Sequence, residues 1–446
     1  MPDTTELVQA SLARGLASSA ELQRQFNVSQ PTLSRVIAQL GEQVVRMGGG
    51  RSTRYALRRY LPQIGSSWPV FRVNESGQPS VQGRLEALAP DHYGFAATTD
   101  PYSQVSDGLP FFLQDLWPQG FIGRTVPKRF PELGLPQRIA DWNDSHVLRY
   151  LTQRGEDPIG NLFIGEESLH RYLKQLQAPP THVDRNDRSR QYPALADMAI
   201  AGMPPGSAAG GQQPKFTTAV RTGDEWRHVL VKFSPIRTDR IAQRWADLLI
   251  AEHIASKALN ILGVRSAATE LMLAGNRVFL ESERFDRSGQ RGRLGVVSLA
   301  AVADHYLGRR DHWIAASQSL QSIGKISTQD VDTVCRAATF AQLIGNTDMH
   351  LGNLSFFFAF GQRLSLAPIY DMLPMMYAPL PGDDSLTREF EPPLPAASNL
   401  AIWRSIAELA EAYWRAVASH ELISKEFALQ ASINLERVAT LKMSVP

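Results

Sequence analysis

Two aspartates and an asparagine in the C-terminal half of the chain have the types and spacing that phosphoryl transfer requires. Asp348 and Asn353 lie in the polar segment GNTDMHLGN, between an apolar helical pattern and an apolar strand pattern. Asp371 follows two short strand patterns joined by a glycine turn, so a hairpin would return it to the same place. One carboxylate can orient an attacking hydroxyl, while the asparagine and the other carboxylate hold a magnesium ion against the phosphates.

Upstream of this loop, a glycine-containing segment and a strand lysine occur in the order that a nucleotide site needs. Lys232 lies in the apolar pattern HVLVKF, where an ammonium group is rare unless an anion pairs with it. Gly210, Gly211, Gln213 and Lys215 lead into the preceding strand, and the backbone N–H groups of such a segment can approach phosphate oxygens. A strand lysine can also reach solvent, and glycine segments are common, so neither feature is sufficient alone.

Five segments resemble, in order, the HipA family of toxin–antitoxin serine/threonine kinases. They are GGQQPK, HVLVKF, LESERFDR, GNTDMHLGN and APIYD, and the resemblance extends from about Val70 to the C-terminus. The resemblance implies a two-lobed, protein kinase-like fold of the α+β class that uses ATP and Mg²⁺ to phosphorylate serine or threonine. It further implies growth inhibition, a protein substrate such as an aminoacyl-tRNA synthetase, and a HipB-like antitoxin as partner.

The same resemblance assigns roles to individual residues of the catalytic segment. Asp348 takes the position of the catalytic base, and Asn353 and Asp371 take the positions of the magnesium ligands. Lys232 takes the position of the lysine that contacts the ATP phosphates. His350 matches a histidine of the family's catalytic loop, although a loop histidine is frequently structural.

The resemblance also includes a hinge, and the sequence departs from the family pattern at two positions. The backbone of Glu283 to Phe285 would read adenine, with Asp286 close by. Ala208 stands where the family often has an autophosphorylated serine, and Ser207 lies one place earlier, which puts self-inhibition through this segment in doubt. Gly352 stands where relatives often have lysine, so one phosphate contact would be missing.

The first 60 residues indicate a winged helix-turn-helix domain that precedes the kinase-like part. Ser18 and Ser19 can cap a helix AELQRQF, and a bend at 27–29 leads into a second helix, SQPTLSRVIAQL. The candidates for reading base edges lie near the exposed start of that helix: Gln30, Thr32, Ser34 and Arg35. The following hairpin pattern resembles a wing along the phosphate backbone and contains five arginines: Arg46, Arg51, Arg54, Arg58 and Arg59. We therefore expect binding to double-stranded DNA; the alternatives are a three-helix capping module with a solvated basic surface and a winged helix used only for protein contacts.

Length, composition and breaker positions predict three parts. We expect the winged helix-turn-helix domain at 1–62, a HipA-like N-terminal subdomain at 68–178 and the kinase-like catalytic region at 190–446, with a linker in the breaker-rich stretch 178–214. A net charge of +2 limits any DNA-binding surface to a local patch. The acidic start, the lack of a membrane-spanning apolar stretch and the single cysteine, Cys335, indicate a cytoplasmic protein with a buried thiol and no membrane partner.

Three other functions are consistent with these residues. A DNA-binding regulator could keep a kinase domain that binds nucleotide without transferring phosphate. A two-lobed kinase fold can also phosphorylate small molecules. A magnesium-dependent nuclease toxin could use the carboxylates to cut DNA held by the N-terminal domain.

Overall fold

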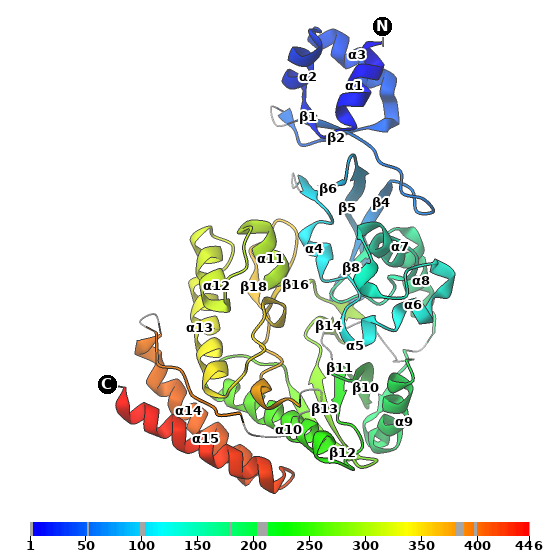
Figure 1. Cartoon of the computed structure of the whole chain (residues 1–446). Helices are drawn as coiled ribbons and strands as arrows, with labels where there is room; N and C mark the ends of the chain where they lie inside the picture. The colour runs from blue at the N-terminus through cyan, green and yellow to red at the C-terminus, as the bar shows by residue number, and fades with distance from the viewer. Residues whose placement is uncertain are drawn as a thin grey trace.

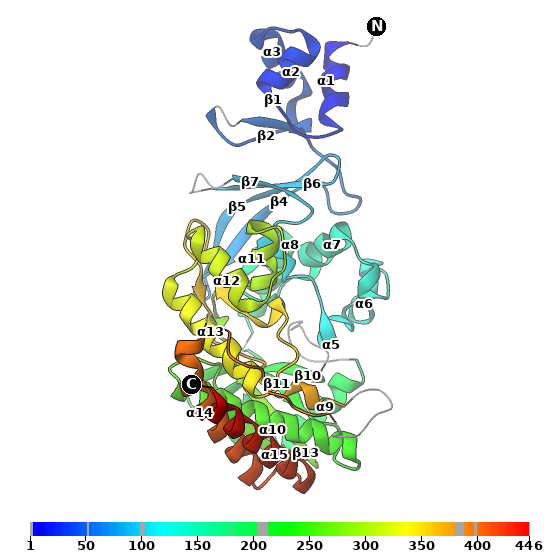
Figure 2. The ribbon, with the colours of Figure 1, turned by 60° about the vertical axis from the view of Figure 1, so that its left-hand side comes forward.

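The computed structural model describes residues 3–50, 53–98, 103–178, 180–202, 213–379, 388–396 and 399–445. These residues form an elongated molecule with the N-terminal domain at one end and the catalytic part at the other (Figure 1). Figure 2 shows the same order from a second direction, with the sheet that contains β4 to β7 between the two ends.

The N-terminal domain packs three helices on a small antiparallel sheet in the order β1-β3-β2. Its elements are α1 (Thr4–Leu12), β1 (Ala17–Ser18), α2 (Ser19–Phe26), α3 (Gln30–Leu40), the short helix η1 (Gly41–Gln43), β2 (Val44–Met47) and β3 (Arg54–Leu57). Ser18 caps α2 as expected, because its hydroxyl accepts from the N–H of Glu21 while the Glu21 carboxylate accepts from the N–H of Ser18. Asn27, with a left-handed φ of 51°, ends α2 and turns the chain into α3.

The chain leaving the N-terminal sheet is paired with the end of β5 (Pro79–Leu88) in the middle domain, so the two domains are packed together. Leu88 is fully buried among residues of β2 and β3. Arg58 pairs with Glu86 at 3.0 Å, and Arg59 pairs with Asp91 at 2.7 Å. The expectation that these two arginines contact DNA phosphates is therefore wrong, since their charges are used in the joint between domains.

The middle domain is built on a five-stranded antiparallel sheet in the order β7-β6-β5-β4-β8, with helices packed against both of its faces. The other elements are β4 (Ser67–Val73), β6 (His92–Ala97), β7 (Ser103–Asp107), α4 (Phe111–Gln114), α5 (Gly120–Gly123), α6 (Val126–Arg129), η3 (Pro131–Leu133), η4 (Ile139–Asp141), α7 (Asp144–Arg154), β8 (Leu162–Ile164) and α8 (Glu166–Leu176).

A second five-stranded sheet, in the order β12-β13-β11-β10-β9, carries the lysines of the candidate site. Its strands are β9 (Val183–Asp184), β10 (Lys215–Thr222), β11 (Glu225–Phe233), β12 (Thr269–Ala274) and β13 (Arg277–Glu283), accompanied by η5 (Arg185–Asp187), α9 (Arg188–Ile200) and α10 (Arg240–Ile261). The predicted hairpin is β10–β11, and the predicted helix is α10. The linker prediction is wrong for α9, which packs Tyr192, Ala196 and Ala199 into the core of this sheet.

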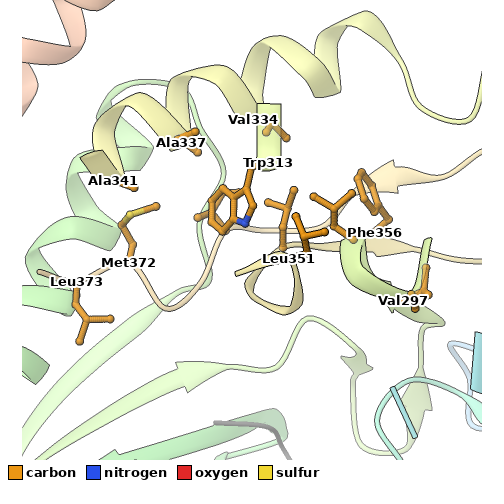
Figure 3. Close-up of a cluster of buried hydrophobic side chains, with 14 of the residues drawn as sticks. Val297, Trp313, Val334, Ala337, Ala341, Leu351, Phe356, Met372 and Leu373 are labelled. Carbon is orange, nitrogen blue, oxygen red and sulfur yellow. The ribbon is translucent and has the colours of Figure 1, made fainter. Parts of the chain in front are cut away.

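The C-terminal part is mainly helical, and its helices pack against the catalytic loop. It contains β14 (Arg287–Ser288), β15 (Gly292–Arg293), β16 (Val296–Ser298), α11 (Leu299–Tyr306), α12 (Trp313–Ser322), α13 (Thr328–Leu343), η6 (Leu351–Asn353), β17 (Ser355–Phe357), β18 (Ser365–Leu366), η7 (Met375–Tyr377), α14 (Leu400–Ser419) and α15 (Lys425–Ser444). Figure 3 shows Trp313 beside Leu351 of the loop and Ala337 of α13. Cys335 is buried in α13 as expected. No helix of the described ranges is both long and apolar enough to span a bilayer.

Truncation of Leu88 to alanine tests the packed joint between the N-terminal and middle domains. We expect Leu88→Ala to lower the free energy of unfolding by about 2–5 kcal/mol, because the buried side chain leaves a cavity. Urea unfolding measures the change. Val81→Ala on the same strand is the matched control: Val81 is 49% exposed, so we expect a change within about 0.5 kcal/mol. Equal effects of the two substitutions would contradict the joint.

Candidate active site

A cavity of about 260 Å³ lies between the β10–β11 hairpin and the loop that contains η6. The residues that line it come from the middle domain, the lysine strands, α10, the end of β13 and the catalytic loop. They include Asp115, Lys215, Lys232, Glu252, Glu283, Phe285, Asp286, His350, Asn353 and Asp371. The structure thus brings together most of the residues that the sequence singled out between Lys215 and Asp371, whereas Asp348 is not among the residues that line the cavity.

A buried ion pair between Lys232 and Glu252 lies at the centre of the cavity wall. The Lys232 Nζ atom donates to the two carboxylate oxygens of Glu252 at 2.6 and 2.8 Å, and it also contacts Asp371 Oδ1. Burial alone would lower the pKa of Lys232, but the charges of Asp371 and Glu252 raise it above its usual range. Lys232 is 3% exposed, so the anion-paired alternative is correct and the solvent-reaching one is wrong.

Lys215 adds a second ammonium group on the neighbouring strand. The register of β10 and β11 places Lys215 directly opposite Lys232, and Lys215 is 2% exposed. Burial lowers the pKa of Lys215 to about 8, with the charge of Asp371 opposing this effect and that of Lys232 adding to it. Two like charges opposite one another are unfavourable unless anions lie nearby. Glu252 and Asp371 supply such anions, since the charges of both carboxylates act on the two lysines.

The catalytic loop is fixed by its own polar side chains. The Asn346 Oδ1 atom accepts from the N–H of Asp348 at 3.0 Å, and the Asn353 Nδ2 atom donates to the carbonyl of Asp348 at 2.9 Å. The indole of Trp313 donates to the carbonyl of His350 at 3.0 Å. These bonds hold the loop while the Asp348 carboxylate remains exposed. His350 Nδ1 accepts from the N–H of Gly352, which is a structural role.

Asn353 and Asp371 have the donor atoms that a magnesium site requires. Because the amide nitrogen of Asn353 is used within the loop, its oxygen is left as the acceptor that can face a cation. Asp371 has a left-handed φ of 54°, which is uncommon for a residue with a side chain and costs about 1–3 kcal/mol. The carbonyl of Ile369 accepts from the N–H of Ala267, which holds this segment against the sheet. The residues present therefore fit a cation shared with a phosphate.

The hinge, Glu283 to Phe285, differs in part from the prediction that its backbone is available to a ligand. The N–H groups of Glu283 and Arg284 already donate to the carbonyls of Ala268 and His228. Glu283 is exposed, while the ring of Phe285 lines the cavity, with its centroid 5.7 Å from that of Tyr370. The N–H groups of Glu283 and Arg284 are therefore already used within the protein, whereas Phe285 contributes its side chain to the cavity wall.

Asp286 lines the cavity, but its oxygens are engaged elsewhere. They accept from Arg284, from Arg287 and from the N–H of Gly160 in the middle domain at 2.8 Å. Although burial opposes ionisation, the two arginines hold the pKa of Asp286 well below its usual range. We correct its cofactor-binding role to a structural one.

The remaining candidates lie away from the cavity or outside the described residues. Gln213 is not among the residues that line the cavity. Gly210, Gly211 and Arg51 fall outside the described ranges. On α3, the side chains of Gln30, Ser34 and Arg35 are exposed and Thr32 is half-buried, and Arg46 and Arg54 are exposed on the hairpin β2–β3.

Sequence reasoning missed Glu252 and Asn346. Glu252 lies in α10, whose residues are buried on nearly all sides, so no periodic pattern marks the carboxylate as special. The only signal was the need of Lys232 for an anion. Asn346 is visible in GNTDMH, where an asparagine two residues before an aspartate is typical of a side-chain turn.

Comparison with known proteins gives two family matches and one full-length relative. Residues 64–173 match the family described as YjjJ-like toxin, middle domain, and residues 207–432 match the HipA-like C-terminal domain. The Toxin YjjJ of Escherichia coli (strain K12) is 35% identical over 447 residues, which covers 100% of this chain and 99% of the relative.

Solved structures extend the comparison to the fold. HipA of Shewanella oneidensis MR-1, solved with HipB and its operator DNA, matches with a TM-score of 0.53 at 16% identity, over 84% of this chain and 96% of that chain. This likeness confirms the predicted α+β, HipA-like fold. The Helicobacter pylori proinflammatory kinase CtkA matches 53% of this chain and 93% of its own at 15% identity, with a TM-score of only 0.35.

The depressed pKa of Lys215 predicts how stability depends on pH. This pKa is about 8, against 10.5 for an ordinary lysine. Between these two values the unfolded chain binds more protons at this position, so the folded state gains stability as the pH rises. We expect the difference in unfolding free energy between wild type and Lys215→Met to grow in favour of wild type by up to about 3 kcal/mol across this window. Urea unfolding in EDTA at several pH values measures it; a constant difference would contradict the prediction.

Proposed function

The chain belongs to the HipA-like toxin family, and from this premise we propose that it is an ATP- and magnesium-dependent protein kinase that phosphorylates a serine or threonine hydroxyl. The observation that carries the proposal is the buried Lys232–Glu252 ion pair in contact with Asp371. A protein kinase needs a strand lysine paired with a helix glutamate, and a carboxylate beside them for the metal. Here the three groups come from β11, α10 and the segment after β18.

Each residue of the site has a proposed role in phosphoryl transfer. Lys232 and Lys215 would hold the phosphates by charge, and Phe285 would contact the base. Asn353 and Asp371 would hold a magnesium ion, whose charge offsets that developing on the phosphates. The exposed carboxylate of Asp348 would orient the acceptor hydroxyl and take up its proton. We further propose that phosphorylation of a protein acceptor, such as an aminoacyl-tRNA synthetase, makes the chain a growth-inhibiting toxin.

A nuclease needs a different arrangement from the one in this cavity. Two-metal nucleases hold their ions between several carboxylates, whereas no cluster of three metal-binding acids, histidines or cysteines occurs in the ranges that the structure describes. The paired lysines, in contrast, are suited to a nucleotide. The site therefore favours the kinase over the nuclease, and the experiment below separates it from a regulator that only binds nucleotide.

Substitution of the two aspartates tests the proposed kinase activity. We expect Asp348→Asn to reduce γ-phosphate transfer from ATP to lysate proteins by about 10²–10⁴-fold with ATP binding retained, because only the proton acceptor is lost. Asp371→Asn should weaken magnesium-dependent ATP binding as well. Radiolabelled ATP and equilibrium binding provide the two measurements.

Asp332→Asn is the matched control for these variants, since Asp332 is exposed on α13 away from the cavity. It should behave as wild type. A wild-type protein that binds ATP but labels no protein would support the regulator, and a labelled metabolite without labelled protein would support a small-molecule kinase. DNA cleavage without ATP would support the nuclease.

We also propose that the N-terminal domain binds double-stranded DNA. The start of α3 presents Gln30, Ser34 and Arg35 to solvent, and its N-terminus is capped by Ser29. Arg46 and Arg54 are exposed on the hairpin β2–β3. The solved HipA from Shewanella is a complex with HipB and operator DNA, which supports DNA and a HipB-like antitoxin as partners of this chain as well.

The salt dependence of binding tests the assignment of Arg54 to DNA phosphates. We expect Arg54→Ala to weaken binding to any duplex sequence and to reduce the slope of log affinity against log salt by about one, because one phosphate contact is lost. Fluorescence anisotropy with a labelled duplex at several salt concentrations measures both quantities. Arg84→Ala, an exposed arginine of β5, is the control. An unchanged slope for Arg54→Ala would contradict the assignment.

A further inference from the structure

A second cavity, of about 510 Å³, lies between the middle domain and the sheet that carries the lysines. One wall comes from α6, α7 and α8, and the other from β10, β11 and the segment after the hinge; these elements can be followed in Figure 1. Its size is within the range of cavities that enclose small ligands. None of the roles proposed above uses it.

The two cavities follow one another along the same face of the β10–β11 hairpin. The register pairs Lys215 with Lys232, Thr217 with Leu230, and Ala219 with His228. Side chains two positions apart on a strand lie on one face, so these three pairs form a continuous row. The first pair lines the candidate active site, and the last lines the second cavity. Arg284 lines both.

The second cavity has an excess of positive charge. Six arginines line it against two carboxylates: Arg129, Arg154, Arg284, Arg287, Arg291 and Arg293 against Glu156 and Asp157. Burial raises the pKa of Glu156, which weakens its contribution as an anion. Asp286 and Glu132 also form ion pairs with arginines of the cavity. Even with these two carboxylates counted, the arginines remain in excess.

Two of these arginines are held by buried contacts at the wall of the cavity. Arg287 and Arg293 share the carboxylate of Asp157 at 3.0 and 3.3 Å, and they also donate to the carbonyl of Pro158. Burial, together with the charges of Arg284 and Arg293, lowers the pKa of Arg287 to about 9. The guanidinium groups therefore repel one another even with their partners in place, and an additional anion would relieve that repulsion.

The mouth of the cavity carries arginines that can reach a ligand. Arg129 is exposed, and its guanidinium lies 5.4 Å from the ring centroid of Phe130. Arg291 is half-buried and donates one N–H to the carbonyl of Ala178. A guanidinium has five N–H donors, so this single bond leaves Arg291 with capacity for the oxygens of a phosphate.

We propose that this second cavity binds a small phosphate-bearing ligand, with Arg129 and Arg291 contacting the phosphate and the buried arginines supplying fixed positive charge. Arginine is the side chain best matched to phosphate, because its fork can donate two parallel hydrogen bonds. The proposal is independent of phosphoryl transfer, since the cavity lies beyond the paired lysines. Because Arg284 borders both cavities, a bound ligand would lie beside the hinge.

Titration of inorganic phosphate into the full-length protein tests the proposal. The active site is first saturated with magnesium and a non-hydrolysable ATP analogue, and binding is followed by calorimetry. We expect saturable binding that Arg291→Glu and Arg129→Glu each weaken by at least about tenfold, corresponding to 1.4 kcal/mol or more. Adenosine monophosphate forms a second arm: tighter binding than phosphate identifies a nucleotide as the ligand, and equal binding identifies a simple phosphate compound.

Arg310→Glu is the matched control, because Arg310 is an exposed arginine paired with Asp304 outside the cavity. It changes the net charge by the same amount and should bind phosphate as wild type does. Lack of saturable binding in the wild type would overturn the proposal. So would wild-type affinity in both Arg291→Glu and Arg129→Glu, or an equal loss in Arg310→Glu. Circular dichroism confirms that each variant is folded.

Discussion

The ammonium group of Lys232 is the constraint on which the catalytic part depends. An unpaired charge inside a protein costs several kcal/mol, so the fold must bring carboxylates to it. It does so from two distant places: Glu252 lies 20 positions along the chain and Asp371 lies 139 positions along. The strand, the helix α10 and the segment after β18 are therefore held together by the same charge that would receive phosphates. In this region, the contacts that stabilise the fold are the same contacts that position the residues of the candidate site.

Lys232 has two acidic partners, Glu252 and Asp371, which come from different parts of the chain. A cation at Asp371 and Asn353 would draw the carboxylate toward itself, yet Lys232 would still keep two hydrogen bonds to Glu252. The buried lysine would thus keep an acidic partner with a cation bound. Asp371 itself has a left-handed backbone and lines the cavity.

Local spacing accounts for part of the site. The β17–β18 hairpin joins the loop of Asn353 to Asp371, so strand geometry explains why both line the cavity, whereas Asp348 is not among the lining residues. Glu252 could not be found in this way, because a helix that is buried on nearly all sides has no polar face from which a carboxylate departs. The helix α9 was missed for a related reason. Its Arg188 pairs with Glu281 at 2.7 Å across the sheet, a contact that propensity does not reveal.

The arginines show how the same residue type takes its role from its neighbours. Arg54 and Arg58 lie four positions apart in one basic segment, yet Arg54 faces solvent while Arg58 pairs with Glu86 of the middle domain. Sequence alone gives both the same charge, and only the fold supplies the acid. At the other end of the middle domain, Asp157 binds Arg287 and Arg293 next to the hinge. The middle domain is consequently packed against the N-terminal domain on one side and the candidate active site on the other, through buried contacts and ion pairs. A separation of the hairpin β2–β3 from β5 would have to expose Leu88, which is buried between them.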